Sequence, residues 1–289
     1  MIRIMNIKLA CNYNEYLREL IDDEEIEIDY VKIPSICEEF LGYDWALENN
    51  IRIMFHGLGI EHSNIAVPNY FVKVDIENLK NIIKTSKMPH ISAHISTYID
   101  SYPEIDWNEY AECNEEGKKI IENNIIKNVE DIKKVFDLDV ILENVPFYGN
   151  YERPKFLCYP EMVKKVLEKT NCNFLLDLSH SKCTAYNSGV EFLTFLQEMP
   201  LEKVIELHVS GSRMNNDILN DEHQELREDD YNTIEFLLRN CPNLKYLTLE
   251  YTPYKEVIER YDTVNKENNR KEKDIVKRQL TRLKEMINK

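Results

Sequence analysis

The segment that decides the fold runs from residue 90 to residue 145: HISAHI (90–95), then EEGKKIIENNIIKNVEDIKKVF (115–136), then DVILENV (139–145). The two outer runs are short and apolar, with the β-branched residues that are typical of buried strands. The middle run is long and amphipathic, which predicts a helix. A strand, a helix and a second strand in this order are typical of a parallel α/β fold.

The same alternation continues on both sides of this segment. Further strand-like runs occupy residues 2–9, 26–33, 51–56, 173–179, 204–210 and 245–251. Helix-like stretches occupy residues 12–20, 37–49, 75–86, 160–170, 190–199, 229–240 and 273–287. Eight strands alternating with eight helices predict one (β/α)8 TIM barrel over residues 1–289, ending in a charged helix. An open doubly wound sheet is disfavoured because the chain has only 7 glycines and no GxGxxG motif.

The composition excludes several classes of partner. The formal net charge is −16, so the surface repels phosphate backbones, and we expect no nucleic acid partner. No stretch approaches the roughly 20 apolar residues of a membrane span. The 7 cysteines include no CxxC pair, and the first residues are predicted to form a strand instead of a signal peptide. We therefore expect reduced thiols in a cytoplasmic protein.

Histidines and carboxylates gather where the predicted strands end. In a barrel, the carboxyl ends of the strands converge on one mouth, where active sites are built. Strands three to eight each direct at least one such side chain to this mouth. The nine candidate metal ligands are His56, His94, Glu143, Asp177, His180, His208, Asp221, His223 and Glu250.

A single histidine at a strand end is more often a structural residue, but the carboxylates argue for a metal site. Glu143 and Asp177 interrupt apolar runs, and a buried carboxylate is costly unless it is paired or bound to metal. Imidazole and carboxylate together suit Fe, Mn, Zn or Co. Nine ligands exceed the needs of one ion, so we expect two or three ions bridged by Glu143 and Asp177. His90 is interpreted as structural, and His62 as a candidate residue of a substrate loop.

Seven short motifs, in order along the chain, resemble the DUF692 (UPF0276) family of multinuclear non-haem iron-dependent oxidases, which are related to the methanobactin biosynthesis enzyme. They are HGLG (56–59), SAHIS (92–96), ILENVPF (141–147), FLLDLSH (174–180), IELHVSG (205–211), DEH (221–223) and TLEY (248–251). Three positions depart from the family pattern. Ala93 replaces a glutamate, Ser212 replaces a second histidine, and Lys32 lies near an acidic position of the second strand.

The resemblance implies a xylose-isomerase-like barrel with iron (Fe2+/Fe3+) bound by His56, His94, Glu143, Asp177, His208, Asp221, His223 and Glu250. His180 stands where the family often has asparagine, and an imidazole there can also bind metal. The resemblance also implies a peptide substrate, oxidised with dioxygen at a cysteine, and a partner protein that binds the leader peptide. Asn144, Ser179 and Tyr251 are expected to orient the ligands.

Two other functions remain open from the sequence. The same barrel could hold Zn2+ or Mn2+ and act as a sugar isomerase or as an endonuclease-IV-like phosphodiesterase. A nuclease of this kind should carry a basic groove, which the net charge of −16 disfavours. The chain could also be a non-catalytic binding partner, although that function would not require nine retained ligands.

Overall fold

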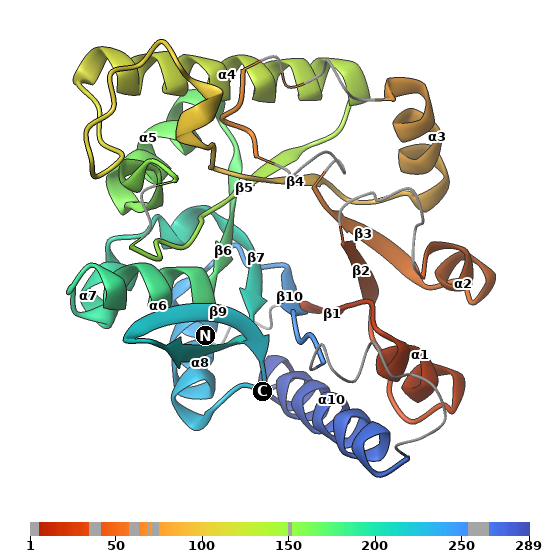
Figure 1. Ribbon diagram of the computed structural model, residues 1–289. Helices are drawn as coiled ribbons and strands as arrows, with labels where there is room; N and C mark the ends of the chain where they lie inside the picture. The colour runs from red at the N-terminus through yellow and green to blue at the C-terminus, as the bar shows by residue number, and fades with distance from the viewer. Residues whose placement is uncertain are drawn as a thin grey trace.

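Eight parallel strands form a curved sheet at the centre of the molecule, and the helices surround it (Figure 1). The computed structural model describes residues 6–34, 42–57, 64–68, 70, 75–149, 152–253 and 266–289. The eight strands are β1 (Lys8–Asn12), β2 (Tyr30–Pro34), β3 (Arg52–His56), β4 (Ile91–His94), β5 (Val140–Glu143), β6 (Asn173–Asp177), β7 (Val204–Val209) and β10 (Tyr246–Leu249). Their order across the sheet is β3-β2-β1-β10-β7-β6-β5-β4.

The strands β3 and β4, at the two ends of this order, are joined by a side chain instead of a ladder. Ser92 Oγ donates to the carbonyl of Phe55 at 3.2 Å and accepts from the amide of Gly57 at 3.3 Å. Beside β4, Asn64 forms a parallel bridge with His94, and the amide of Ile65 donates to the His94 carbonyl at 2.9 Å. The barrel is therefore nearly closed, and the predicted (β/α)8 architecture is confirmed.

Helices cover the outside of the sheet. They are α1 (Glu15–Asp22), α2 (Tyr43–Glu48), α3 (Ile76–Ser86), α4 (Glu115–Phe136), α5 (Pro160–Thr170), α6 (Leu178–Asn187), α7 (Phe192–Gln197), α8 (Glu228–Asn240) and α10 (Lys266–Ile287). Short 3-10 turns lie at η1 (Ile99–Ser101), η2 (Lys155–Cys158) and η3 (Leu201–Lys203). None of the helices in these described parts of the chain is both long and apolar enough to cross a membrane.

The long helix α4 shows why the sequence folds as it does locally. The Asn114 side chain caps its first turn by accepting from the amide of Gly117 at 2.9 Å. Glu115 and Glu116 follow in the first turn and lysines occupy the last turn, which suits the helix dipole. The sequence predicted these bounds, and those of α5, because both helices carry clear end signals and a regular apolar face.

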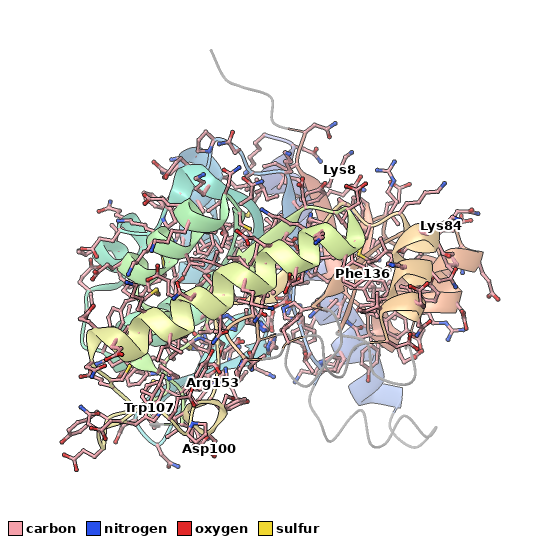
Figure 2. All side chains as sticks on the ribbon, turned by 90° about the horizontal axis from the view of Figure 1, so that it is seen from above. Lys8, Lys84, Asp100, Trp107, Phe136 and Arg153 are labelled. Atoms are coloured by element: carbon pink, nitrogen blue, oxygen red, sulfur yellow. The ribbon has the colours of Figure 1, made fainter. Side chains whose placement is uncertain are left out.

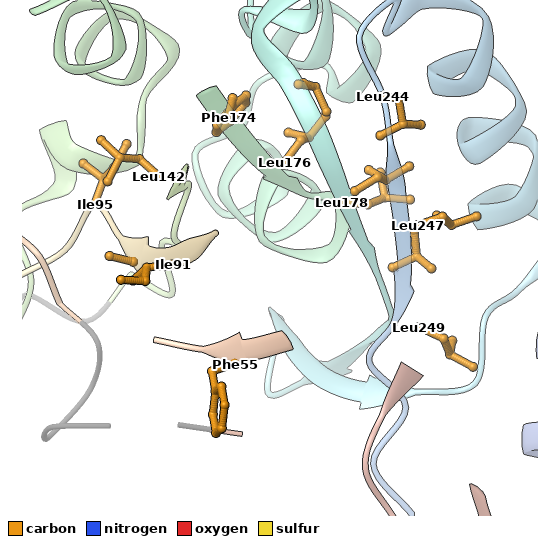
Figure 3. Packing of buried hydrophobic residues seen from close by; sticks show 14 of the residues in the cluster. Phe55, Ile91, Ile95, Leu142, Phe174, Leu176, Leu178, Leu244, Leu247 and Leu249 are labelled. Carbon is orange, nitrogen blue, oxygen red and sulfur yellow. The ribbon is translucent and has the colours of Figure 1, made fainter. Parts of the chain in front are cut away.

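The hydrophobic core lies between the sheet and the helices (Figure 3). Along β7, Leu207 and Val209 belong to this outer core, whereas Glu206 and His208 face the inside of the barrel. This alternation with a period of two is the geometry of a strand. The outer side chains pack against the helices, and the inner side chains are available to build a site.

Four predictions of secondary structure differ from the structure. Strand β1 begins at Lys8, so residues 6 and 7 of the predicted strand 2–9 are not part of it, and residues 2–5 lie outside the described residues. Strand β2 begins at Tyr30 instead of residue 26. Glu24 has φ +57°, so the chain still turns there, and the alternating residues 25–28 precede the strand. The run 173–179 was predicted as one strand, but β6 ends at Asp177, where α6 begins at once.

The fourth difference concerns the segment after β7, for which the sequence predicted neither a strand nor a helix. It forms an antiparallel hairpin of β8 (Gly211–Asn215) and β9 (Ile218–Gln224), packed beside α6 (Figure 1). The turn between the strands contains Asn216 and Asp217, both at positive φ. This conformation suits a tight hairpin turn formed by asparagine and aspartate.

Candidate metal centre

All nine predicted ligands lie at one mouth of the barrel. Five stand within or at the end of strands β3 to β7, and Glu250 directly follows β10. His180 lies in the first turn of α6, and both Asp221 and His223 belong to β9. His62 falls outside the described residues.

Glu143 lies in the middle of the imidazoles. Its Oε2 is 3.1 Å from His56 Nε2 and 3.4 Å from His94 Nε2. Its Oε1 is 3.5 Å from His180 Nδ1 and 3.8 Å from His208 Nδ1. Both oxygens are buried, and neither has a hydrogen-bond partner among the described residues. A carboxylate in this position calls for a cation.

Glu250 forms a second contact point on the same side of the mouth. Its Oε1 lies 3.0 Å from His208 Nδ1 and 3.8 Å from His56 Nε2. Asn12 at the end of β1 donates to the same oxygen at 3.3 Å. The first strand therefore contributes to the site, which the sequence did not predict.

Asp221 joins the hairpin to the barrel. Its Oδ2 lies 3.2 Å from His180 Nε2 and 3.0 Å from His223 Nε2, and its Oδ1 accepts from Ser210 Oγ at 2.8 Å. His223 has φ +48°, and its Nδ1 lies 3.0 Å from the Glu250 carbonyl oxygen. These contacts fix the orientation of a residue that comes from outside the barrel.

Asp177 both caps α6 and faces the site. Its Oδ1 accepts from the amide of His180 at 2.7 Å, while its buried Oδ2 has no hydrogen-bond partner among the described residues. Asn144 holds it in place: its Oδ1 accepts from the Asp177 amide at 2.8 Å and its Nδ2 donates to the Asp177 carbonyl at 3.1 Å. The expected orienting role of Asn144 therefore has a geometric basis, whereas the hydroxyl of Tyr251 bonds to Glu272 instead.

Burial and mutual attraction shift the pKa values of these groups. Burial raises the pKa of Asp177 to about 7, although His180 opposes the shift. Burial opposes the charged form of Glu143 too, but His94, His56 and His208 outweigh it and hold its pKa well below the usual range.

Among the imidazoles, burial disfavours the charged form and the carboxylates favour it. Glu250 is the main carboxylate that raises the pKa of His208 to about 9, and Asp221 is the main one that raises the pKa of His223 to about 10. The pKa of His180 is also raised, chiefly by Asp177, whereas burial lowers that of His56. In the metal-free protein, protons on the imidazoles thus offset the negative charge of the carboxylates, at the place where bound metal ions would offset it.

The donor set fits metal ions. Three overlapping groups each bring their ligand atoms within 4.8 Å of one another: His56, Glu143 and His208; Glu143, Asp177 and His180; Asp177, His208 and Glu250. Nδ1 of His208 is also buried without a hydrogen-bond partner among the described residues, like the oxygens of Glu143. Imidazole and carboxylate ligands shared between groups suit a cluster of transition metals.

A charged layer lies directly beneath the site, and the sequence did not predict it. Lys32 and Glu206 are both fully buried, and Lys32 Nζ lies 2.6 Å from Glu206 Oε1. His90 Nε2 lies 2.7 Å from Glu206 Oε2, and Thr248 Oγ1 donates to Oε1 at 2.9 Å. His90 therefore belongs to this layer, where it contacts Glu206.

Above the site, the mouth encloses a cavity of about 330 Å³. Six of the candidate ligands line it, namely His56, His94, His180, Asp221, His223 and Glu250. Asn64, Val145, Pro146, Tyr148 and Arg153 complete the wall. Four of these five come from the segment after β5: Val145 and Pro146 belong to the motif ILENVPF, whereas no motif covers Tyr148 or Arg153.

A profile of the family described as RiPP precursor modification enzyme MbnB/TglH/ChrH matches residues 17–248. The chain belongs to this family. The match extends from α1 to β10, so it contains every candidate ligand except Glu250. The resemblance expected from the seven motifs is confirmed.

Curated relatives of this MbnB/TglH/ChrH family member carry the name UPF0276 protein. One from Vibrio parahaemolyticus is 23% identical over 175 residues, which cover 58% of this chain and 56% of that protein. One from Pseudomonas aeruginosa is 23% identical over 195 residues, which cover 65% of this chain and 64% of that protein. The chain thus spans little more than half the length of these relatives.

Solved structures with the same fold are sugar epimerases, isomerase-like proteins and a nuclease. A xylose isomerase domain containing protein from Salmonella typhimurium has a TM-score of 0.61 at 11% identity, with 98% of this chain and 99% of that chain covered. A D-tagatose 3-epimerase-like protein has a TM-score of 0.58 at 16% identity, with 97% and 100% covered. Endonuclease IV from Thermus thermophilus has a TM-score of 0.52 at 10% identity, with 92% and 99% covered. At these identities, the likeness confirms the xylose-isomerase-like barrel alone.

Proposed function

We propose that the protein is a multinuclear iron-dependent oxidase that modifies a peptide substrate at a cysteine with dioxygen. The observation that carries the proposal is the position of Glu143, whose two buried oxygens lie 3.1 to 3.8 Å from four imidazoles without a hydrogen-bond partner among the described residues. Membership of a family described as RiPP precursor modification enzymes supports the peptide substrate.

The chain's own residues would assemble the centre and limit access to it. Glu143 and Asp177 would bridge the ions, and the five imidazoles would complete their coordination. Iron bound there would supply a Lewis acid for the cysteine thiolate and an ion able to change valence for dioxygen. Asn144 would keep Asp177 in place, and the wall formed by Val145, Pro146 and Tyr148 would restrict water around the reacting residue.

The decisive experiment separates redox chemistry from Lewis acidity. Peptides would be sought among short cysteine-containing open reading frames beside the gene, and oxygen consumption would be followed with iron-loaded and zinc-substituted protein. We expect oxygen uptake that depends on both iron and peptide, with binding but no turnover in the zinc form. Full turnover by the zinc form, or under strict anaerobiosis, would refute the oxidase. It would favour an isomerase or phosphodiesterase using Zn2+ or Mn2+.

A further inference from the structure

Arg153 lines the same cavity as the candidate ligands and forms no ion pair with a carboxylate of the described residues. It is the one lysine or arginine among the described residues that line this cavity. No carboxylate of those residues forms an ion pair with it, although Asp and Glu together number 52 against 36 Lys and Arg. A guanidinium that lines a concave site, and that forms no ion pair in a chain with so many acidic residues, is available to bind an anion.

Two contacts fix the position of Arg153. Its Nη2 donates to the hydroxyl of Tyr98 at 2.8 Å, and its guanidinium carbon lies 4.7 Å from the centre of the Tyr98 ring. The amide of Ile99 donates to the carbonyl of Glu152 at 3.0 Å, which ties the two loops together next to this pair. Figure 2 shows Arg153 beside the loop that contains Asp100 and Trp107. The guanidinium is therefore held in place before any substrate arrives.

The geometry leaves most of the guanidinium free to bind. Arginine carries five N–H donors, and the Tyr98 hydroxyl accepts from one of them. The remaining donors suit the two oxygens of a carboxylate, which arginine binds in a bidentate manner. A cavity of about 330 Å³ holds a reacting residue and little more, so the carboxylate must lie within a residue or two of the reacting atom.

We propose that Arg153, positioned by Tyr98, is a carboxylate-binding subsite that fixes the substrate beside the metal centre. This inference rests on the proposed function, because it takes the substrate to be a peptide. The carboxylate is either the C-terminus of the peptide or an acidic side chain next to the reacting cysteine. In either case the contact selects which cysteine of a precursor is placed at the mouth.

The test uses small probes and iron-loaded protein under anaerobic conditions, with affinity measured by calorimetry. N-acetylcysteine is compared with N-acetylcysteinamide for the C-terminal source. N-acetyl-Cys-Asp-amide is compared with N-acetyl-Cys-Asn-amide for the side-chain source. We expect one acidic probe to bind about ten- to a hundredfold more tightly than its neutral counterpart, as for a hydrogen bond to a charged group.

The variants locate this preference. In R153Q the ratio between acidic and neutral probes should fall below about threefold. Y98F should reduce the ratio in part, because the guanidinium loses one of its two fixing contacts. K155Q is the matched control and should retain the full ratio. Lys155 lies close by in the chain and above the ring of Phe147 at 5.0 Å, but it does not line the cavity.

Two results with the unaltered protein would overturn the subsite: acidic and neutral probes that bind equally in both pairs, or no binding of any probe. An unchanged preference for the acidic probe in R153Q would also overturn it, because the carboxylate would then be bound by the metal ions. N-acetylalanine and its amide separate this failure from that of the proposed function. If the acid preference persists without the thiol and disappears in R153Q, the subsite stands even where oxidation at cysteine does not.

Discussion

Nζ of Lys32 lies 2.7 Å from Nε2 of His208, so a buried ammonium touches the underside of a candidate metal ligand. The opposite ring nitrogen, Nδ1, lies 3.0 Å from Glu250 at the mouth. Nε2 is also 3.0 Å from Glu206 Oε1, the carboxylate that pairs with Lys32. The imidazole therefore connects the charged layer inside the barrel to the mouth. Nε2 can either donate to Glu206 or accept from Lys32, so this layer controls where the ring proton of His208 lies, and hence whether Nδ1 is available to a metal ion.

The first prediction concerns this layer. Replacing Lys32 with methionine leaves the carboxylate of Glu206 fully buried without its main counter-charge. We expect the free energy of unfolding of the metal-free protein to fall by about 3–5 kcal/mol, measured by urea denaturation. The double variant K32M/E206Q should regain part of this loss. An unchanged urea midpoint for K32M would show that Lys32 and Glu206 do not form the pair.

The second prediction concerns the number of ions. Three ligand groups that share Glu143, Asp177 and His208 would hold more than one metal. Protein made in iron-replete cells and handled without oxygen should contain at least about two transition-metal ions per chain, as measured by elemental analysis together with Mössbauer spectroscopy. One ion or fewer would contradict a multinuclear centre.

The third prediction distinguishes a metal bridge from a structural ion pair. Glu143→Gln should lower the metal content and abolish activity, while the metal-free barrel remains folded. Its control is Glu122, which is equally buried but lies on α4 and pairs with Lys165 at 2.5 Å and with Lys169. Glu122→Gln should lower the melting temperature and keep the metal. The reverse pattern, with a lower melting temperature and full metal content for E143Q, would make Glu143 structural.

The fourth prediction is that metal affinity rises with pH. The pKa values of His208 and His223 are raised to about 9 and about 10 in the metal-free protein, and that of Asp177 is raised to about 7. Below these values the groups hold protons that a metal ion must displace. Competition with a chelator should therefore show affinity for Mn2+ rising at least about a hundredfold from about pH 6 to about pH 8, roughly tenfold per unit for each proton released. A flat profile would contradict protonated ligands.

The candidate site could be predicted from the sequence because parallel strands place their carboxyl ends together. Glu143 and Asp177 stood out since each is an acid at the end of an apolar run. Once eight strands were predicted, the convergence of the ligands at or just beyond the strand ends followed from the fold, whereas Asp221 and His223 come from the hairpin. The prediction of the fold and the prediction of the site therefore rest on the same sequence pattern, the alternation of strands and helices.

The parts that could not be predicted depend on contacts between distant residues. Lys32 and Glu206 each interrupt an apolar run, but nothing local shows that β2 and β7 bring them within 2.6 Å across the barrel. The hairpin was missed because residues 211–224 are mostly polar, and only its pairing makes it a strand pair. Arg153 lies in a loop, where neither period nor motif assigns a role.

The place of β1 in the sheet has a consequence for how the protein folds. β1 lies between β2 and β10, with Ala10 opposite both Tyr30 and Thr248. During synthesis, one edge of β1 has no partner until the ribosome has produced residues 246–249. Pairing over such a separation in sequence is slow, because a long loop must close before the contact forms. The nascent chain thus exposes an apolar strand edge for most of its synthesis, and the mouth is completed only when Glu250 arrives opposite Asn12.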